Sequence, residues 1–220
     1  MPVKRRASGK LYSGWSLFTL ASLLMSLGVL FAATRVDLST ASGVSAMLQL
    51  SVQLAVPWLY LAFAASSLAV LVPGKASRWL LRNRRMVGLS FAAGMAWQLL
   101  FILWLVFGHR QYYLEHAYSP YDLAEQVPGY IVLIAMTVTS FGPGRRLLSP
   151  RQWRVLHKGG IYFLWAVVWS TYWFELYYYD DIQAIDYVYY WSGFGAWLLR
   201  VMAWVKHREA RPAVPAPRSA

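Results

Sequence analysis

The stretch Met86–Gly108, MVGLSFAAGMAWQLLFILWLVFG, carries no charged residue and decides the fold class. A membrane-spanning helix needs roughly 20 mainly apolar residues, because it crosses about 30 Å of hydrocarbon and must satisfy its own backbone hydrogen bonds. The whole chain of 220 residues is 58% hydrophobic and 14% charged, whereas soluble domains carry about 25% charged residues. The sequence therefore predicts an all-α integral membrane protein and excludes a soluble enzyme, a disordered chain and a disulfide scaffold.

Six stretches have the length and composition of a membrane span. Arg200 interrupts the last one, and we expect its side chain to extend toward the nearer headgroups. Pro57 is expected to kink the second. Residues 1–14 form a basic N-terminal segment, residues 15–205 the transmembrane domain, and residues 206–220 a tail that we expect to be disordered. The predicted spans are Trp15–Ala33, Ser45–Pro73, Met86–Gly108, Val127–Gly144, Gly159–Tyr178 and Tyr187–Val205.

The charged residues separate to the two sides of these spans. Eighteen of the 21 lysines and arginines lie in the two terminal segments and in the second and fourth connections, a side shared by a single acidic residue, Glu209. Positively charged connections stay in the cytoplasm, so we expect six crossings with both termini cytoplasmic. This placement explains the net charge of +12 without nucleic-acid binding, while contact with anionic headgroups stays open. The first apolar run exceeds the usual 7–15 residues of a signal peptide, which favours a retained span.

The side chains exclude several chemistries. The absence of cysteine rules out disulfides, thiolate zinc sites, cysteine-held iron–sulfur clusters and c-type haem. No Asp or Glu lies in the middle of a predicted span, which disfavours a proton-coupled transporter. The chain has no G-x-G-x-x-G or P-loop motif, so a nucleotide-dependent electron donor would be a separate protein.

The four histidines differ in where they fall. His109 and His116 lie in the outer connection after the third span, and His207 lies in a basic cluster after the last, where we expect solvated side chains. His157 stands at the cytoplasmic start of the fifth span. From its position alone, His157 could cap a helix end or contact lipid phosphate; its selection as the candidate cofactor-binding residue follows from the motifs described next. No catalytic residue and no metal site is predicted.

Two motifs near His157 carry a family resemblance. The run Arg84–Leu89, RRMVGL, opens the third span, and Trp153–His157, WRVLH, opens the fifth; Thr139–Ser140 and Arg145–Leu147 lie between them. Over residues 45–175 this order resembles the ferric-reductase-like transmembrane family. Its nearest pattern is that of the haem-bearing membrane subunits that supply electrons to bacterial periplasmic methionine-sulfoxide reductases.

The resemblance implies a bundle in the bacterial inner membrane that holds b-type haem between the third and fifth spans and serves a separate electron donor or acceptor protein. It also implies two further histidines, but this chain has Gln98 at the first position and none in Trp169–Tyr172 at the second. Only His157 matches a family ligand, so we expect at most one b-type haem. The first hypothesis is an electron-transfer subunit. The second is a haem-free relative that serves as a structural or assembly partner of another membrane complex, in which Gly88 allows close helix approach and Trp153 lies at the membrane interface.

Overall fold

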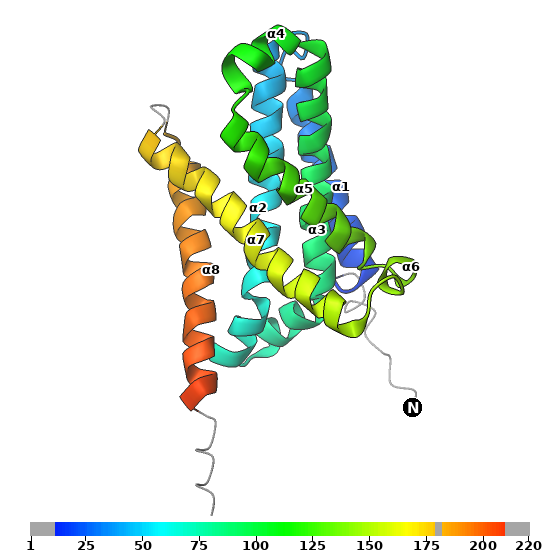
Figure 1. Cartoon of the computed structure of the whole chain (residues 1–220), viewed down its shortest axis with the longest axis vertical. Helices are drawn as coiled ribbons and strands as arrows, with labels where there is room; N and C mark the ends of the chain where they lie inside the picture. Colours follow the sequence, from blue (N-terminus) through cyan, green and yellow to red (C-terminus); the bar gives the residue numbers. More distant parts are fainter. Residues whose placement is uncertain (1–11, 179–181, 210–220) are drawn as a thin grey trace, which may run out of the picture.

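The computed structural model describes residues 12–178 and 182–209, and all regular structure within these ranges is helical (Figure 1). This confirms the all-α prediction for the described residues. Residues 206–209 of the predicted tail are helical rather than disordered, and the rest of the tail lies outside the described ranges. The elements are α1 (Trp15–Ala33), α2 (Ala41–Leu71), α3 (Lys75–Gly108), α4 (Arg110–Tyr112), the π-helical segment η2 (Tyr113–Ala117), α5 (Pro120–Val138), α6 (Gly142–Arg145), α7 (Pro150–Tyr178) and α8 (Ala184–Glu209).

The long helices alternate in direction along the chain. In Figure 1, α1, α3 and α7 run upward and α2, α5 and α8 run downward, so that α1 begins and α8 ends at the same end of the bundle. Helices α1, α2 and α3 are long and apolar enough to cross a membrane, and α5 contains a shorter apolar part, Leu123–Val138. Helices α7 and α8 have 29 and 26 residues, more than the roughly 20 that a span needs, but they are less apolar. These long apolar helices are compatible with an integral membrane protein, and crossing by the other three long helices stays a prediction.

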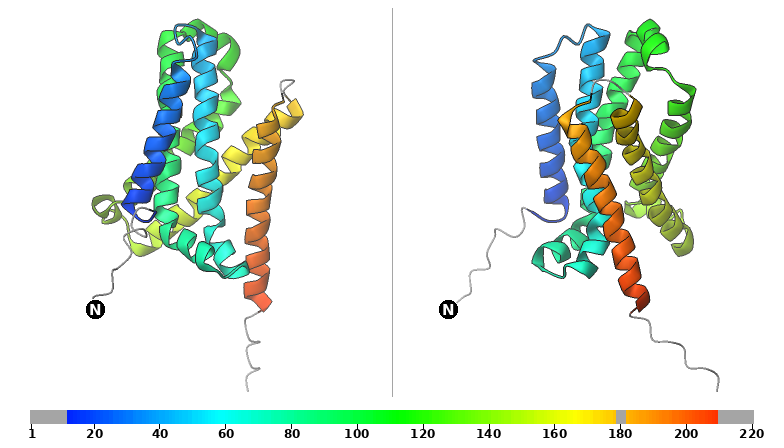
Figure 2. Two further views of the ribbon diagram at one scale, coloured as in Figure 1. Left: turned by 180° about the vertical axis from the view of Figure 1, so that it is seen from behind. Right: turned by 90° about the vertical axis from the view of Figure 1, so that its left-hand side faces the viewer.

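Helix α2 lies at the centre of the bundle and contacts α1, α3, α7 and α8 (Figure 2). Gly94 lets α3 approach α2 closely, since a Cβ atom there would lie 2.6 Å from the Cβ of Ala55. A Cβ at Gly88 would meet only the Cβ of Ala62, at an ordinary 4.0 Å. The close approach that we expected at Gly88 therefore occurs at Gly94. The central core consists of Ala55, Val56, Leu59, Tyr60, Phe63, Ala64, Phe91, Leu133, Leu164, Val168, Tyr172 and Ala196.

Pro57 lies inside α2, which continues past it. Because proline has no backbone N–H, the carbonyl of Gln53, four residues earlier, loses its helical donor. The hydroxyl of Tyr189 in α8 donates to that carbonyl at 2.7 Å. The proline therefore creates an acceptor that holds α8 against α2.

Two further side chains of α8 donate to carbonyls of α2. Arg200 Nε donates to the Phe63 carbonyl at 2.9 Å, and its guanidinium carbon lies 4.2 Å from the Phe63 ring centroid. Lys206 Nζ donates to the Val70 carbonyl at 3.2 Å. Residue numbers rise together along the two helices, so α8 runs parallel to α2. The Arg200 guanidinium thus packs on a buried ring and a carbonyl of α2, and its reach toward the headgroups stays a prediction.

Five of the six long helices begin earlier than the predicted spans, and the difference is largest for α3 and α7. Helix α3 begins at Lys75, so the basic segment expected as a connection is helical. Helix α7 begins at Pro150 because Ser149 and Gln152 form a reciprocal cap: Ser149 N donates to Gln152 Oε1 at 2.9 Å, and Gln152 N donates to Ser149 Oγ at 3.2 Å. His157 consequently lies within α7 and does not cap it.

The predicted fourth span, Val127–Gly144, is interrupted in the structure. Helix α5 ends at Val138, and the short helix α6 starts at Gly142 with Pro143 in its first turn. A proline is disfavoured inside a helix but favoured in the first turn, where its missing N–H is not needed. Residues 139–141 therefore form a turn, and this turn faces α7.

Candidate functional site

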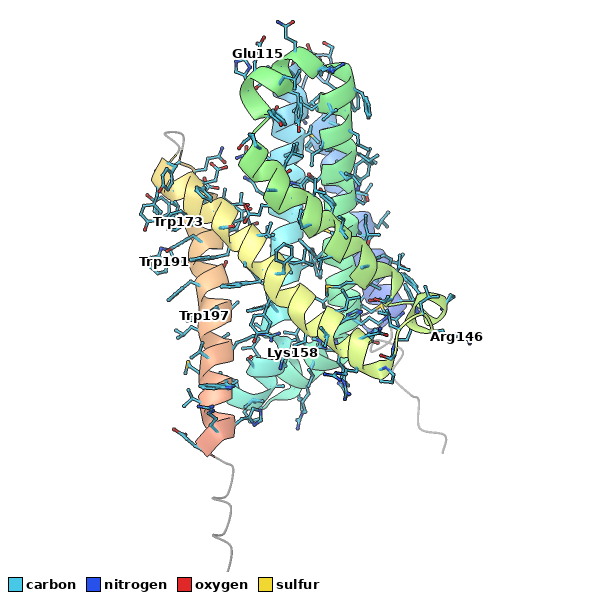
Figure 3. All side chains as sticks on the ribbon, viewed as in Figure 1. Glu115, Arg146, Lys158, Trp173, Trp191 and Trp197 are labelled. Atoms are coloured by element: carbon cyan, nitrogen blue, oxygen red, sulfur yellow. The ribbon has the colours of Figure 1, made fainter. Side chains whose placement is uncertain are left out.

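A cavity of about 730 Å³ lies at the end of the bundle where α7 begins. Residues of α2, α3, α5, α7 and α8 and the turn between α5 and α6 form its wall. Lys158 belongs to this wall and is labelled in Figure 3, at the end of the bundle opposite to Glu115. The cavity contains His157, the candidate residue from the sequence, together with both motifs that carry the family resemblance.

The imidazole of His157 is held by Thr139. Its Nε2 lies 3.0 Å from Thr139 Oγ1, and that hydroxyl lies 2.6 Å from the Ala135 carbonyl. A threonine hydroxyl has one proton; if that proton is donated to the carbonyl, Oγ1 is left as the acceptor for His157. In that tautomer, with the proton on Nε2 of His157, this nitrogen is the donor and has no free lone pair.

Trp153 fixes the same ring from the preceding turn of α7. The Trp153 and His157 rings stack with centroids 4.3 Å apart, and Trp153 Nε1 donates to the Thr139 carbonyl at 3.2 Å. The guanidinium carbon of Arg145 lies 4.9 Å from the Trp153 ring centroid. Trp153 is thus part of the site, packed between two other cavity residues, rather than an interface residue alone.

The charged side chains in the described wall of the cavity are all positive. Six of its lining residues carry a positive charge, and none of its described lining residues is Asp or Glu. Arg200 and Arg84, from α8 and α3, are near enough to repel each other electrostatically. The six are Arg84, Arg85, Arg145, Arg154, Lys158 and Arg200.

The two positions at which the family resemblance implies further histidines are engaged by α5. At Gln98, the amide oxygen Oε1 accepts a hydrogen bond from the Tyr130 hydroxyl at 2.7 Å. In the segment Trp169–Tyr172, the Ser170 hydroxyl lies 2.7 Å from Glu125 Oε1. Tyr130 and Glu125 both belong to α5, and the sequence did not single out either residue.

The other histidines lie away from the cavity. His109 ends α3, His116 stacks on Tyr112 with ring centroids 4.8 Å apart, and His207 lies in the last turn of α8. Within the described ranges, no group of three or more His, Cys, Asp or Glu side chains could hold a metal ion. His157 is the one histidine among the described residues of the cavity wall.

These donors do not fit the six-coordinate b-type haem that the resemblance implies. The resemblance implies that this group takes two neutral imidazoles as iron ligands. The cavity offers one imidazole, whose Nε2 is engaged by Thr139 Oγ1 at 3.0 Å, and the wall contributed by α3 offers Arg84, Arg85, Gly88, Leu89 and Phe91. Neither a guanidinium nor an apolar side chain is an iron ligand.

Comparison of the chain with protein-family models, with curated proteins and with solved structures gave no match. The residues and their geometry therefore carry the evidence on function. The sequence contains one signal for the cavity. Arg200 interrupts an apolar span, and a charge inside a span usually has a partner or a ligand.

Proposed function

We propose that this chain is a haem-free membrane protein with a ferric-reductase-like bundle and that it serves as a structural or assembly partner of another membrane complex. The observation that carries the proposal is that each position at which the resemblance implies a haem ligand makes a hydrogen bond within the protein. Gln98 is hydrogen-bonded to Tyr130, Ser170 is hydrogen-bonded to Glu125, and Nε2 of His157 lies 3.0 Å from Thr139 Oγ1, at hydrogen-bond distance. Each position is occupied by a protein hydrogen bond, so each would lose a partner on binding iron.

The proposal includes six crossings of a bacterial inner membrane with both termini in the cytoplasm. The alternation of the six long helices and the parallel course of α2 and α8 support an even number of crossings. Because the chain has no cysteine, Glu115→Cys and Arg146→Cys each create a single label site. A membrane-impermeant maleimide should label Glu115→Cys on intact spheroplasts and label Arg146→Cys only after permeabilisation. Equal labelling of both before permeabilisation would contradict this topology.

Haem content tests the proposal directly. The protein should be expressed with ample haem, purified in mild detergent, and measured by oxidised and dithionite-reduced absorption spectra together with an iron assay. We expect a folded, colourless protein that contains no stoichiometric iron. A reduced b-type spectrum at one haem per chain would overturn the proposal.

A second candidate function is electron transfer through a single b-type haem at His157. One observation favours it: the imidazole lies in the wall of a cavity with six cations, which would neutralise the two propionates of a haem. In that case His157→Ala should abolish the haem absorbance, and the matched variants His109→Ala and His116→Ala should retain it. Retention of haem in His157→Ala would exclude this second candidate.

The role as an assembly partner is tested in the native membrane. Removal of the chain should lower the amount of one membrane complex, measured by quantitative proteomics, and the wild-type chain should restore it. His157→Ala should restore it equally, because no haem is involved. Unchanged amounts of all membrane complexes after removal would contradict the role.

A further inference from the structure

The cations of the cavity have a feature that membrane topology does not explain. Positively charged residues in connections stay in the cytoplasm. This rule accounts for the many basic residues at this end of the bundle. Arg200 is not in a connection, because it lies within α8 and its Nε donates to a carbonyl of α2. An arginine inside a span is costly and is retained where it pairs with an opposite charge or takes part in binding.

No opposite charge from the described residues reaches Arg200 in the cavity. Its guanidinium lies 4.2 Å and 4.6 Å from the ring centroids of Phe63 and Tyr162, and the like charge of Arg84 repels it. Arg84 and Lys158 line the same space from α3 and α7. Like charges brought together from three helices favour an anionic ligand between them, because an anion would turn the repulsion into attraction.

The chemistry of the wall narrows the class of anion. Guanidinium groups donate two parallel hydrogen bonds to phosphate oxygens, and the hydroxyls of Ser66 and Thr137 lie in the same wall. Deeper in the cavity the wall is apolar and includes Leu59, Leu133 and Leu164, all of which are buried in the core. A ligand that matches both parts has a phosphate at one end and a hydrocarbon chain at the other.

We infer that this cavity binds the phosphate group of an anionic phospholipid from the cytoplasmic leaflet, with part of an acyl chain along the apolar wall. The inference rests on the proposed function, since a haem at His157 would fill the same space. The bound lipid would contact α3, α7 and α8 at the same time. The surface that these helices present to neighbouring proteins would therefore depend on the lipid.

The test compares two double variants that remove the same charge. Arg84→Gln with Lys158→Gln removes two cavity cations, whereas Arg78→Gln with Arg151→Gln removes two exposed cations of the same helices that are not in the cavity wall. Native mass spectrometry of the full chain in detergent measures binding of phosphatidylglycerol and of phosphatidylcholine with the same acyl chains. We expect one tightly held phosphatidylglycerol, weaker phosphatidylcholine, and a loss of phosphatidylglycerol affinity of about tenfold in the cavity variant only.

The other possible results would overturn the inference. Equal loss in both double variants, or equal binding of the two lipids, would overturn the inference, because the attraction would then be general. Inorganic phosphate is the second arm: if it displaces the lipid at equal phosphate concentration, the ligand is a soluble phosphate and the lipid assignment is wrong. If the double cavity variant does not fold, Arg154→Gln against Arg151→Gln gives the same comparison with one charge. An absorption spectrum of each sample reports haem, so failure of the proposed function is seen separately.

Discussion

The positions at which the resemblance implies cofactor ligands fall in two halves of this bundle, one around Gln98 and Ser170 and one around His157. The two halves differ in structure. Around Gln98 and Ser170, side chains of α5 form hydrogen bonds with the polar groups, and at Gly94 helix α3 approaches α2 closely. Around His157, the helices enclose about 730 Å³ lined by six cations. The comparison teaches that positions at which the resemblance implies cofactor ligands can differ in structure within one bundle. In one half the space is occupied by protein, and in the other it stays open and is electrostatically suited to a different ligand.

Helix packing gives the largest expected difference between the halves. Gly94→Ala should destabilise the protein by about 1–3 kcal/mol, because the new Cβ would lie 2.6 Å from the Ala55 Cβ in the closely packed region. Gly88→Ala, at the cavity wall, should be neutral or stabilise by up to about 1 kcal/mol, since its Cβ would have an ordinary contact and alanine favours a helix. Unfolding in detergent, followed by circular dichroism, measures both. Equal effects of the two substitutions would break the comparison.

Polar substitutions should give a smaller difference in the same direction. Tyr130→Phe removes the hydroxyl that donates to Gln98 at 2.7 Å and should cost about 0.5–1.5 kcal/mol. Lys158→Gln should change the free energy of unfolding by less than about 0.5 kcal/mol when no lipid is added, because its ammonium is exposed to the open cavity and faces other cations. Both values come from the same detergent unfolding assay. A large loss in Lys158→Gln would mean that the cations stabilise the fold itself.

The smallest expected difference is that between the costs of one substitution in two backgrounds. It concerns the hydrogen bond by which Tyr189 of α8 contacts the Gln53 carbonyl of α2. Tyr189→Phe should cost less in a Pro57→Ala background than in the wild type, because alanine restores a helical N–H donor to the Gln53 carbonyl. The coupling energy of this double-mutant cycle should be about 0.6 kcal/mol, the average for hydrogen bonds between membrane helices. Additive effects would show that the Tyr189 hydroxyl does not replace the donor that proline lacks.

Much of the fold could be predicted because apolar length is a strong signal. The ranges of α1 and of the apolar part of α3 agree with the predicted spans. The ends of α5 and α7 could not be found by hydropathy, since they depend on local hydrogen bonding. Ser149 and Gln152 cap α7 at a polar segment, and Pro143 interrupts an apolar one.

The candidate site was predictable only in part. His157 was singled out by its motif, and the cavity contains it. The bonds from Tyr130 and Glu125 could not be predicted, because they depend on how α5 lies against α3 and α7, which no spacing along the chain encodes. The approach of Arg84 to Arg200 likewise joins residues more than a hundred positions apart.

The most direct measurement is an electron cryo-microscopy map of the protein purified in mild detergent from cells with ample haem and native lipid. The account predicts density for a phosphate group between Arg84, Lys158 and Arg200, a hydrocarbon chain along the apolar wall, and Nε2 of His157 still on Thr139. A planar porphyrin on His157 would contradict the account, and so would a cavity without any bound phosphate.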